Sequence, residues 1–257
     1  MITSVSNSRV KRIVSLNQKA KDRRREDCYV VEGIKMFLEA PVEEIEEVYV
    51  SEDFDLSVCR EKLAALPWEQ VTAEVFRKMS DTAAPQGILC VMRRKHYGLE
   101  QLLSSPAPLL MLLEDLQDPG NLGTILRTGE GAGIDGVILS RESADIYNPK
   151  TIRSTMGSIY RVPFVYAEDF GAAIEELKRR GILLYAAHLR GQVWYDEPDY
   201  RGASAFLIGN EGNGLKPETA DRADVCMKIP MQGQVESLNA AMASGILMYE
   251  AFRQRRG

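Results

Sequence analysis

Hydrophobic positions in the second half of the chain gather in short runs, and these runs alternate with longer segments in which apolar residues recur at helical spacing. The predicted strands are at 109–114, 136–140, 182–189, 204–209 and 225–230. The predicted helices are at 121–133, 170–181 and 237–254. Apolar strands that alternate with amphipathic helices are typical of a parallel sheet covered on both faces. The pattern therefore predicts an α/β domain over residues 109–257.

Residues 1–93 show a shorter version of this alternation. Residues 27–40 predict a strand, a glycine turn and a helix, 46–50 and 87–92 predict strands, and 56–66 predict a helix. Residues 94–108 are polar and then rich in Ser and Pro, which is typical of a linker. We therefore expect a small N-terminal α/β domain, a linker at 94–108 and a larger C-terminal domain.

Composition changes this picture little. The chain has 257 residues, of which 45% are hydrophobic and 27% charged, as in ordinary globular proteins. Its four cysteines lie far apart without a Cys-x-x-Cys pair, so neither a zinc site nor a disulfide framework is predicted. The first residues lack the apolar core of a signal peptide, and the longest apolar run, 108–113, is too short to span a bilayer. We expect a reduced, cytoplasmic protein without membrane segments.

Charge is uneven along the chain. The net charge of -5 does not indicate a general affinity of the whole chain for nucleic acid, yet the first 25 residues are strongly basic. Asp22 opposes eight cations there: Arg9, Lys11, Arg12, Lys19, Lys21, Arg23, Arg24 and Arg25. This segment is either a solvated helix face or an arm that contacts phosphates, together with Arg93, Arg94 and Lys95.

Several familiar motifs are absent or misplaced. Gly131–Gly136 matches the dinucleotide-binding glycine pattern, but a predicted helix precedes it and a strand follows, so a helix C-cap and turn is the better interpretation. No Walker motif and no Gly-x-Ser-x-Gly elbow occurs. His96 and His188 lack neighbours at metal-ligand spacing, and no metal site is predicted.

Three polar, glycine-bearing loops remain, at 118–133, 207–215 and 229–241. Each follows a predicted strand, and ligands bind at the carboxyl edge of open parallel sheets. Asn121 can cap the helix that follows the first loop, and Ser237 or Asn239 can cap the last helix. The second loop, Leu-Ile-Gly-Asn-Glu-Gly-Asn-Gly-Leu, carries only a negative charge, which does not suit a phosphate.

Taken together, the loops resemble the SpoU/TrmH family of RNA ribose 2′-O-methyltransferases, within the SPOUT class. The first motif is Asp118-Pro119-x-Asn121-x-Gly123 and then Arg127. The second is Gly209-Asn210-Glu211 and then Gly214, and the third is Ile229-Pro230-Met231 followed by Ser237-Leu238-Asn239. Val31-Glu32-Gly33 more loosely resembles the opening of the RNA-binding domain that often precedes the methyltransferase domain.

The resemblance implies a specific chemistry. The cofactor would be S-adenosylmethionine (SAM), a sulfonium cation without phosphate, and no metal would be needed. The fold would be a C-terminal parallel-sheet SPOUT domain with a deep trefoil knot, the rare exception to normal chain topology. Family members are homodimers, with the Arg127 position near the subunit boundary. The RNA would be 23S ribosomal RNA in preference to transfer RNA.

The resemblance also implies roles for individual residues. The catalytic set would be Asn121, Arg127, Glu211, Ser237 and Asn239. The cofactor-binding set would be Leu189, Gly209, Asn210, Glu211, Gly212, Ile229, Met231 and Leu238. Arg127 would stabilise the developing alkoxide, because arginine hardly ever loses its proton. Glu211 would either accept the proton or orient Asn121.

Three other functions stay open at the level of the sequence. A non-catalytic RNA-binding protein on the same scaffold is disfavoured by the intact polar set, and a SPOUT enzyme that methylates a base is disfavoured by the Asn…Arg and Ser-Leu-Asn pattern. A dinucleotide oxidoreductase is disfavoured by the misplaced glycines.

Overall fold

The computed structural model describes residues 1–256 and divides the chain into two compact units. The first unit joins Met1–Lys95 to Asp145–Tyr160, and the second joins His96–Ala144 to the chain from Arg161 onward. The chain therefore passes between the units three times.

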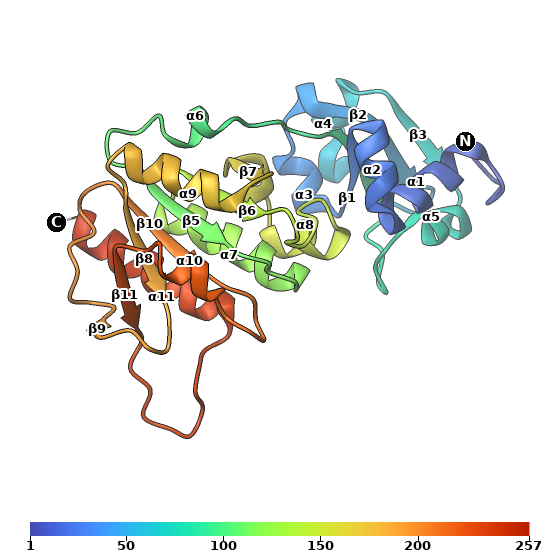
Figure 1. Cartoon of the computed structure of the whole chain (residues 1–257). Helices are drawn as coiled ribbons and strands as arrows, with labels where there is room; N and C mark the ends of the chain where they lie inside the picture. The colour runs from blue at the N-terminus through green and yellow to red at the C-terminus, as the bar shows by residue number, and fades with distance from the viewer. Residues whose placement is uncertain (257) are drawn as a thin grey trace. The chain divides into compact units, whose positions relative to one another are not determined.

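A four-stranded sheet with helices forms the first unit (Figure 1). Its strands are β1 (Cys28–Glu32), β2 (Ile45–Ser51), β3 (Trp68–Val71) and β4 (Ile88–Arg93), in the order β1-β4-β2-β3. Strands β1 and β2 pair antiparallel with β4, whereas β3 pairs parallel with β2. The α-helices are α1 (Ser8–Gln18), α2 (Ala20–Glu26), α3 (Ile34–Glu39), α4 (Arg60–Ala64), α5 (Ala73–Met79) and α8 (Pro149–Thr155). Short 3-10 turns lie at Val42–Glu44, Leu56–Cys59 and Ser158–Tyr160.

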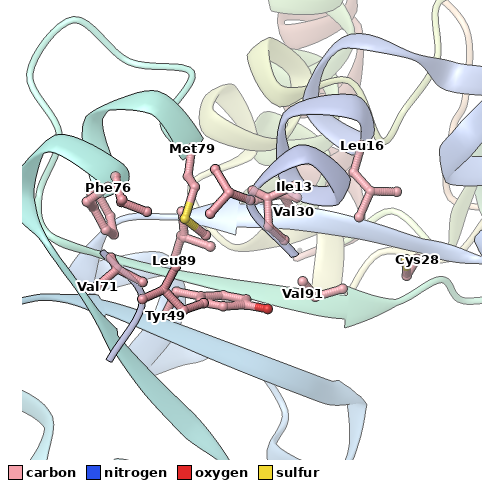
Figure 2. Close-up of a cluster of buried hydrophobic side chains, with 13 residues drawn as sticks. Ile13, Leu16, Cys28, Val30, Tyr49, Val71, Phe76, Met79, Leu89 and Val91 are labelled. Atoms are coloured by element: carbon pink, nitrogen blue, oxygen red, sulfur yellow. The ribbon is translucent and has the colours of Figure 1, made fainter. Parts of the chain in front are cut away.

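The helix α1 is part of the core of this unit. Its residues Val10, Ile13 and Leu16 are buried against β1, β4 and α5, as Figure 2 shows for Ile13 and Leu16. Phe76 and Met79 of α5 lie in the same cluster. Because an apolar stripe on one helix face buries that face, residues 8–18 cannot be a free arm.

The segment 145–160 belongs to the first unit through specific polar contacts. Arg23 is only 3% exposed, and its guanidinium donates to Asp145 Oδ2 at 2.7 and 3.0 Å. The Tyr147 ring packs against that of Tyr29 at a tilt of 40°, with centroids 4.4 Å apart, and the Tyr160 hydroxyl donates to the carbonyl of Met36. A buried charge needs such a partner, so this segment completes the unit.

A seven-stranded sheet forms the second unit (Figure 1). Its strands are β5 (Leu109–Leu113), β6 (Gly136–Ser140), β7 (Phe164–Ala167), β8 (Leu183–Ala187), β9 (Val193–Trp194), β10 (Ser204–Ile208) and β11 (Val225–Lys228). Each pair of neighbouring strands in this sheet is parallel. The helices are α6 (Leu99–Leu102), α7 (Pro119–Ala132), α9 (Phe170–Arg179), α10 (Pro217–Ala220) and α11 (Ala240–Arg255).

Helices cover both faces of this sheet. One face of β5, β8 and β10 packs against Leu102 of α6 and against Ile174 and Leu177 of α9. Residues that point to the opposite face, such as Met111 and Phe206, are buried too, and α11 contacts both β10 and α7 there. The predicted α/β fold with a helix-covered parallel sheet and a small N-terminal α/β unit is confirmed.

Strand order departs from chain order on one side of the sheet. The order is β7-β6-β5-β10-β8-β11-β9, so β10 lies between β5 and β8 and the chain then crosses back to β11. The expected trefoil knot stays a prediction, as do the domain limits 1–93, 94–108 and 109–257.

The structure adds elements that the hydrophobic pattern did not predict. Strand β7 is only four residues long and α8 only seven, and the expected linker contains α6 with Leu102 fully buried. Gly133, with φ +74°, caps α7, and β6 follows it, which confirms the turn expected at Gly131–Gly136. Within residues 1–256, no helix combines the length and apolar character needed to cross a membrane.

Candidate active site

Polar side chains converge at the carboxyl edge of the second unit's sheet. The segments that follow β5, β10 and β11 carry Asn121, Glu211 and Asn239, which lie far apart in sequence. Parallel strands end at the same edge, so the topology brings these segments together.

The first segment starts helix α7. Asp118 is the N-cap, since its Oδ1 accepts from the backbone N–H of Asn121 at 2.8 Å, and Pro119 occupies the first helical position. The expectation that Asn121 is the cap was therefore wrong. Proline at the first position starts the helix earlier, which leaves the Asn121 side chain free for other contacts.

Glu211 binds the start of α7 with its whole carboxylate. Its Oε2 accepts from the N–H of Gln117 at 2.9 Å, and its Oε1 accepts from the N–H of Asp118 at 2.9 Å and from Asn121 Nδ2 at 3.0 Å. Partial burial alone would raise the pKa of Glu211, but the hydrogen bonds from Gln117, Asn121 and Asp118 hold it below its usual range. Glu211 is therefore an ionised acceptor at neutral pH.

Asn239 extends this network to α11. Its Oδ1 accepts from the N–H groups of Ala241 and Met242, so it is the N-cap, and its Nδ2 donates to Asn121 Oδ1 at 3.0 Å. Because a carboxylate can only accept, the amino group of Asn121 must face Glu211 and its oxygen must face Asn239. The hydrogen bonds thus fix the orientation of both amides.

Close backbone approach requires glycine at two positions of the same edge. A Cβ on Gly209 would lie 2.0 Å from the carbonyl carbon of Gly214, and one on Gly191 would lie 2.5 Å from that of Met227. Gly191 is not among the residues predicted from the sequence, although a glycine two residues beyond Leu189 and just past a predicted strand was a usable signal.

The remaining predicted residues follow β8, β10 and β11 in the chain, and most of their side chains are apolar. Leu189 is 63% exposed, and Ile229, Met231 and Leu238 are half-buried. Asn210 Oδ1 accepts from the N–H groups of Gly212 and Asn213, which closes the loop internally.

Two predicted catalytic residues stand outside the network. Ser237 lies in the exposed stretch 232–237 of the long loop between β11 and α11, which Figure 1 shows extending from the sheet. Arg127 is exposed on α7, and within residues 1–256 no side-chain hydrogen bond or ion pair engages its guanidinium. Over that range no cluster of three His, Cys, Asp or Glu side chains could hold a metal ion.

Half of the basic N-terminal segment is already paired. Arg9 pairs with Glu69, Arg12 with Glu26 and Glu47, Arg23 with Asp145, and Arg25 with Asp22. Arg93, Arg94 and Lys95 each lie within 4 Å of an acidic side chain, those of Glu46, Asp27 and Glu44, and their expected contact with phosphates stays a prediction. Within residues 1–25, the exposed cations without an ion pair to the described residues are Lys11, Lys19, Lys21 and Arg24.

Comparison with known proteins gives the chain a family context. Residues 108–249 match the model of the SpoU rRNA Methylase family, and residues 7–90 match the MRM3-like substrate binding domain. The 23S rRNA (guanosine(2553)-2′-O)-methyltransferase RlmP of Bacillus subtilis is 32% identical over 96% of this chain and 97% of its own length.

Solved structures agree over nearly the full length. The SpoU methyltransferase AviRb from Streptomyces viridochromogenes, in complex with the cofactor AdoMet (SAM), has a TM-score of 0.89 at 27% identity, covering 98% of this chain and 99% of its own. An AdoMet-bound rRNA methyltransferase from Sinorhizobium meliloti has a TM-score of 0.88 at 30% identity, covering 98% of this chain and 97% of its own.

Proposed function

Since the chain belongs to the SpoU rRNA methylase family, we propose that it transfers the methyl group of SAM to a ribose 2′-hydroxyl of 23S ribosomal RNA. The observation that carries the proposal is the hydrogen-bonded chain from Glu211 through Asn121 to Asn239. This hydrogen-bond network joins the segments that follow β5, β10 and β11, and it gives one side of the site fixed donors and acceptors.

The carboxyl edge of the sheet suits SAM. Gly209 and Gly191 leave no room for a Cβ, so backbone groups line this edge at close range. The half-buried side chains of Ile229, Met231 and Leu238 offer apolar contacts, and the loop's one charge is negative, which suits a sulfonium cation. SAM, when bound, supplies an electrophilic methyl group.

Glu211 acts as an orienting group in this proposal, not as the proton acceptor. Its carboxylate already accepts three hydrogen bonds, and its pKa lies below the usual range, so it is a poor base at neutral pH. It holds the amide of Asn121 in one orientation. Asn121 and Asn239 keep hydrogen-bonding capacity for the ribose, because an amide has two donors and two lone pairs.

Arg127 supplies positive charge to the reacting ribose or the neighbouring phosphate. An unpaired, exposed guanidinium can stabilise an alkoxide without giving up a proton, and the hydroxyl proton then passes to solvent water as the methyl group leaves the sulfonium. It lies on α7, which packs against α11, where Met242 is 61% and Tyr249 49% exposed. We propose that a second copy of the chain covers this apolar surface, which would put Arg127 near the subunit boundary of a homodimer.

Ribosomal RNA is favoured over transfer RNA for a specific reason. The relative named for 23S rRNA matches 96% of this chain, which includes the N-terminal unit. A guanosine is therefore the first nucleotide to test. We propose that Lys11, Lys19, Lys21 and Arg24 contact RNA phosphates, and that the protein acts in the cytoplasm, where ribosomal RNA is available.

The experiment is a map of 2′-O-methylation in total RNA from a strain that lacks the protein. We expect one 23S rRNA position to lose its methyl group and to regain it when the wild-type chain is supplied. Loss of a tRNA methyl group would favour the alternative substrate. An unchanged map would support a non-catalytic RNA-binding protein, and loss of a base methyl group would point to a different SPOUT reaction.

A further inference from the structure

The residues just after β5 bind both ends of the glycine loop, by which we mean residues 209–215. These two residues are Glu114 and Asp115, and neither belongs to the sequence motifs of the site. Glu211 lies within this loop, so whatever fixes the loop's position also fixes the carboxylate that orients Asn121.

Glu114 holds the exit of the glycine loop. It is only 4% exposed, and its Oε2 accepts from the backbone N–H of Lys216 at 2.8 Å. Its Oε1 accepts from the Thr219 hydroxyl at 2.5 Å. A buried carboxylate needs such donors, and they come from Lys216, which directly follows the loop, and from Thr219 in α10.

Asp115 binds residues at both the start and the end of the glycine loop. Its carbonyl accepts from Asn210 Nδ2 at 2.8 Å, and its Oδ2 lies 2.7 Å from Lys216 Nζ. Ser140 Oγ, at the end of β6, accepts from Asp115 N and donates to Asp115 Oδ1, each at 2.7 Å. All four polar atoms of Asp115 are thereby engaged.

The backbone of Asp115 is unusual, with φ +51° in the left-handed region. A non-glycine residue holds this conformation at some cost, and such residues cluster at functional sites. Here the conformation points the carbonyl at Asn210 while the side chain reaches Lys216.

We propose that Asp115 and Lys216 form a positioning pair that holds the glycine loop against the end of β5, so that Glu211 keeps Asn121 in the orientation that methyl transfer needs. The inference rests on the proposed methyl transfer. The contacts of Asp115 and Lys216 are to the loop, to β6 and to each other, and in this proposal both residues act through Glu211.

A purely stabilising role would look different. The Lys216 side chain is 52% exposed, and exposed ion pairs add little to global stability. Loss of the pair should therefore leave the unfolding transition nearly unchanged while it moves the loop. A small displacement of a group at an active site can reduce the reaction rate strongly, even when the lost contact contributes little to the unfolding free energy.

Hydrogen–deuterium exchange of the protein without ligand tests the first half of the proposal. Asp115→Asn tolerates the left-handed backbone and keeps an acceptor for Ser140, whereas Lys216→Met keeps the aliphatic stem. Each should speed exchange in peptides covering 209–216 about two- to fivefold, as expected for loss of a partly exposed ion pair. The control is Lys178→Met, which removes an ion pair with Asp224 elsewhere in the same unit and should leave these peptides unchanged.

Single-turnover methyl transfer at saturating SAM tests the second half. Both variants should lose on the order of tenfold in rate per folded molecule, the double variant no more than either single one, and Lys216→Arg should regain most of the rate. Unchanged exchange in 209–216, or faster exchange with a wild-type rate, would overturn the positioning pair. If the wild-type chain transfers no methyl group to any RNA, the proposed function fails, and the exchange result still decides whether the pair holds the loop.

Discussion

Glu211 is the one charged residue of the stretch 207–215, and its environment decides what it can do. Three donors hold its pKa below the usual range despite partial burial, which alone would raise it. A carboxyl whose pKa is lowered on folding stabilises the folded state above its unfolded pKa, and this contribution is lost as the pH falls through the folded pKa. The network is therefore fully formed at neutral pH.

We expect Glu211→Gln to lower the rate of methyl transfer without changing the shape of the pH–rate profile between about pH 6 and 8, because Glu211 does not titrate there. The amide oxygen replaces only one of the two carboxylate oxygens. Its amino group then opposes either the N–H of Gln117 or the N–H of Asp118 together with Asn121 Nδ2. Single-turnover rates across this pH range are the measurement. An inflection present in the wild type and absent in the variant would make Glu211 the base.

Gly209 tests the close backbone approach at the same edge. In Gly209→Ala the new methyl group would meet the backbone of Gly214 and Leu215 at 2.0–2.1 Å, so the loop must move. We expect SAM binding measured by calorimetry to weaken by at least about tenfold, since backbone is costly to displace. The matched control is Gly202→Ala, where a Cβ meets nothing within 4 Å. Equal affinities for SAM in the two variants would contradict the assigned cofactor edge.

The role of Arg127 is inferred from the chemistry of its guanidinium, since its side chain makes no contact within the hydrogen-bond network. We expect Arg127→Ala to keep SAM affinity and to reduce methyl transfer on the order of 10²–10³-fold, the usual effect of losing one preorganised electrostatic group. Arg127→Lys should restore little, because a point charge on a flexible stem does not replace a planar guanidinium. Single-turnover rates and sedimentation are measured together. A folded dimer with normal turnover removes Arg127 from the catalytic set.

At the scale of elements, the hydrophobic pattern predicted the long strands of both units and the long helices of the second unit, because burial there follows a regular period. It missed β7 and α8, which are short and give periodicity too few residues to act on. It correctly included Asn239 among the possible N-caps of α11. It placed the start of α7 too late, because Asp118 is the N-cap and Pro119 occupies the first helical position. The Glu114 and Asp115 contacts could not be predicted, because nothing local reveals a partner a hundred residues away.

Residues 1–25, which form α1 and α2, contain cations held in ion pairs and exposed cations without an ion pair. Deleting residues 1–25 would remove core residues such as Ile13, so charge substitution is the cleaner experiment. We expect the variant with Lys11, Lys19, Lys21 and Arg24 changed to Gln to flatten the slope of log K against log salt for RNA binding by about three, at roughly 0.7 of a unit for each of four phosphate contacts to single-stranded RNA.

The control for this charge variant removes the same number of cations from the second unit. Arg179, Arg201, Arg222 and Arg253 are each paired with an acidic neighbour, so changing them to Gln should leave the slope nearly unaltered. Equal slopes in both variants would mean that α1 and α2 present only a solvated face.

At the scale of the whole molecule, the first unit depends on residues 145–160, which the family model assigns to the methyltransferase part. Asp145→Asn leaves the Arg23 guanidinium buried without its charge partner, and we expect a loss of about 3–5 kcal/mol in the unfolding free energy of this unit. Asp81→Asn is the matched control, because its pair with Arg153 is exposed and should contribute about 1 kcal/mol or less.

Urea unfolding followed through Trp68 reads the first unit alone once Trp194, the second of the two tryptophans, is changed to Phe. A double variant, Arg23→Met with Asp145→Asn, should recover part of the loss, since no charge is then left unpaired. Similar losses for Asp145→Asn and Asp81→Asn would show that the buried pair does not hold the segment to the unit.

The central claim is methyl transfer to a ribose oxygen, and one measurement reaches it directly. Purified protein is incubated with 23S rRNA and methyl-labelled SAM, the RNA is digested to nucleosides, and the labelled nucleosides are identified by mass spectrometry. The account predicts label in a single 2′-O-methylnucleoside, abolished when Asn121, Glu211 and Asn239 are replaced together and unaffected by EDTA. Label in a base-methylated nucleoside, or no label in RNA from a strain lacking the protein, would contradict it.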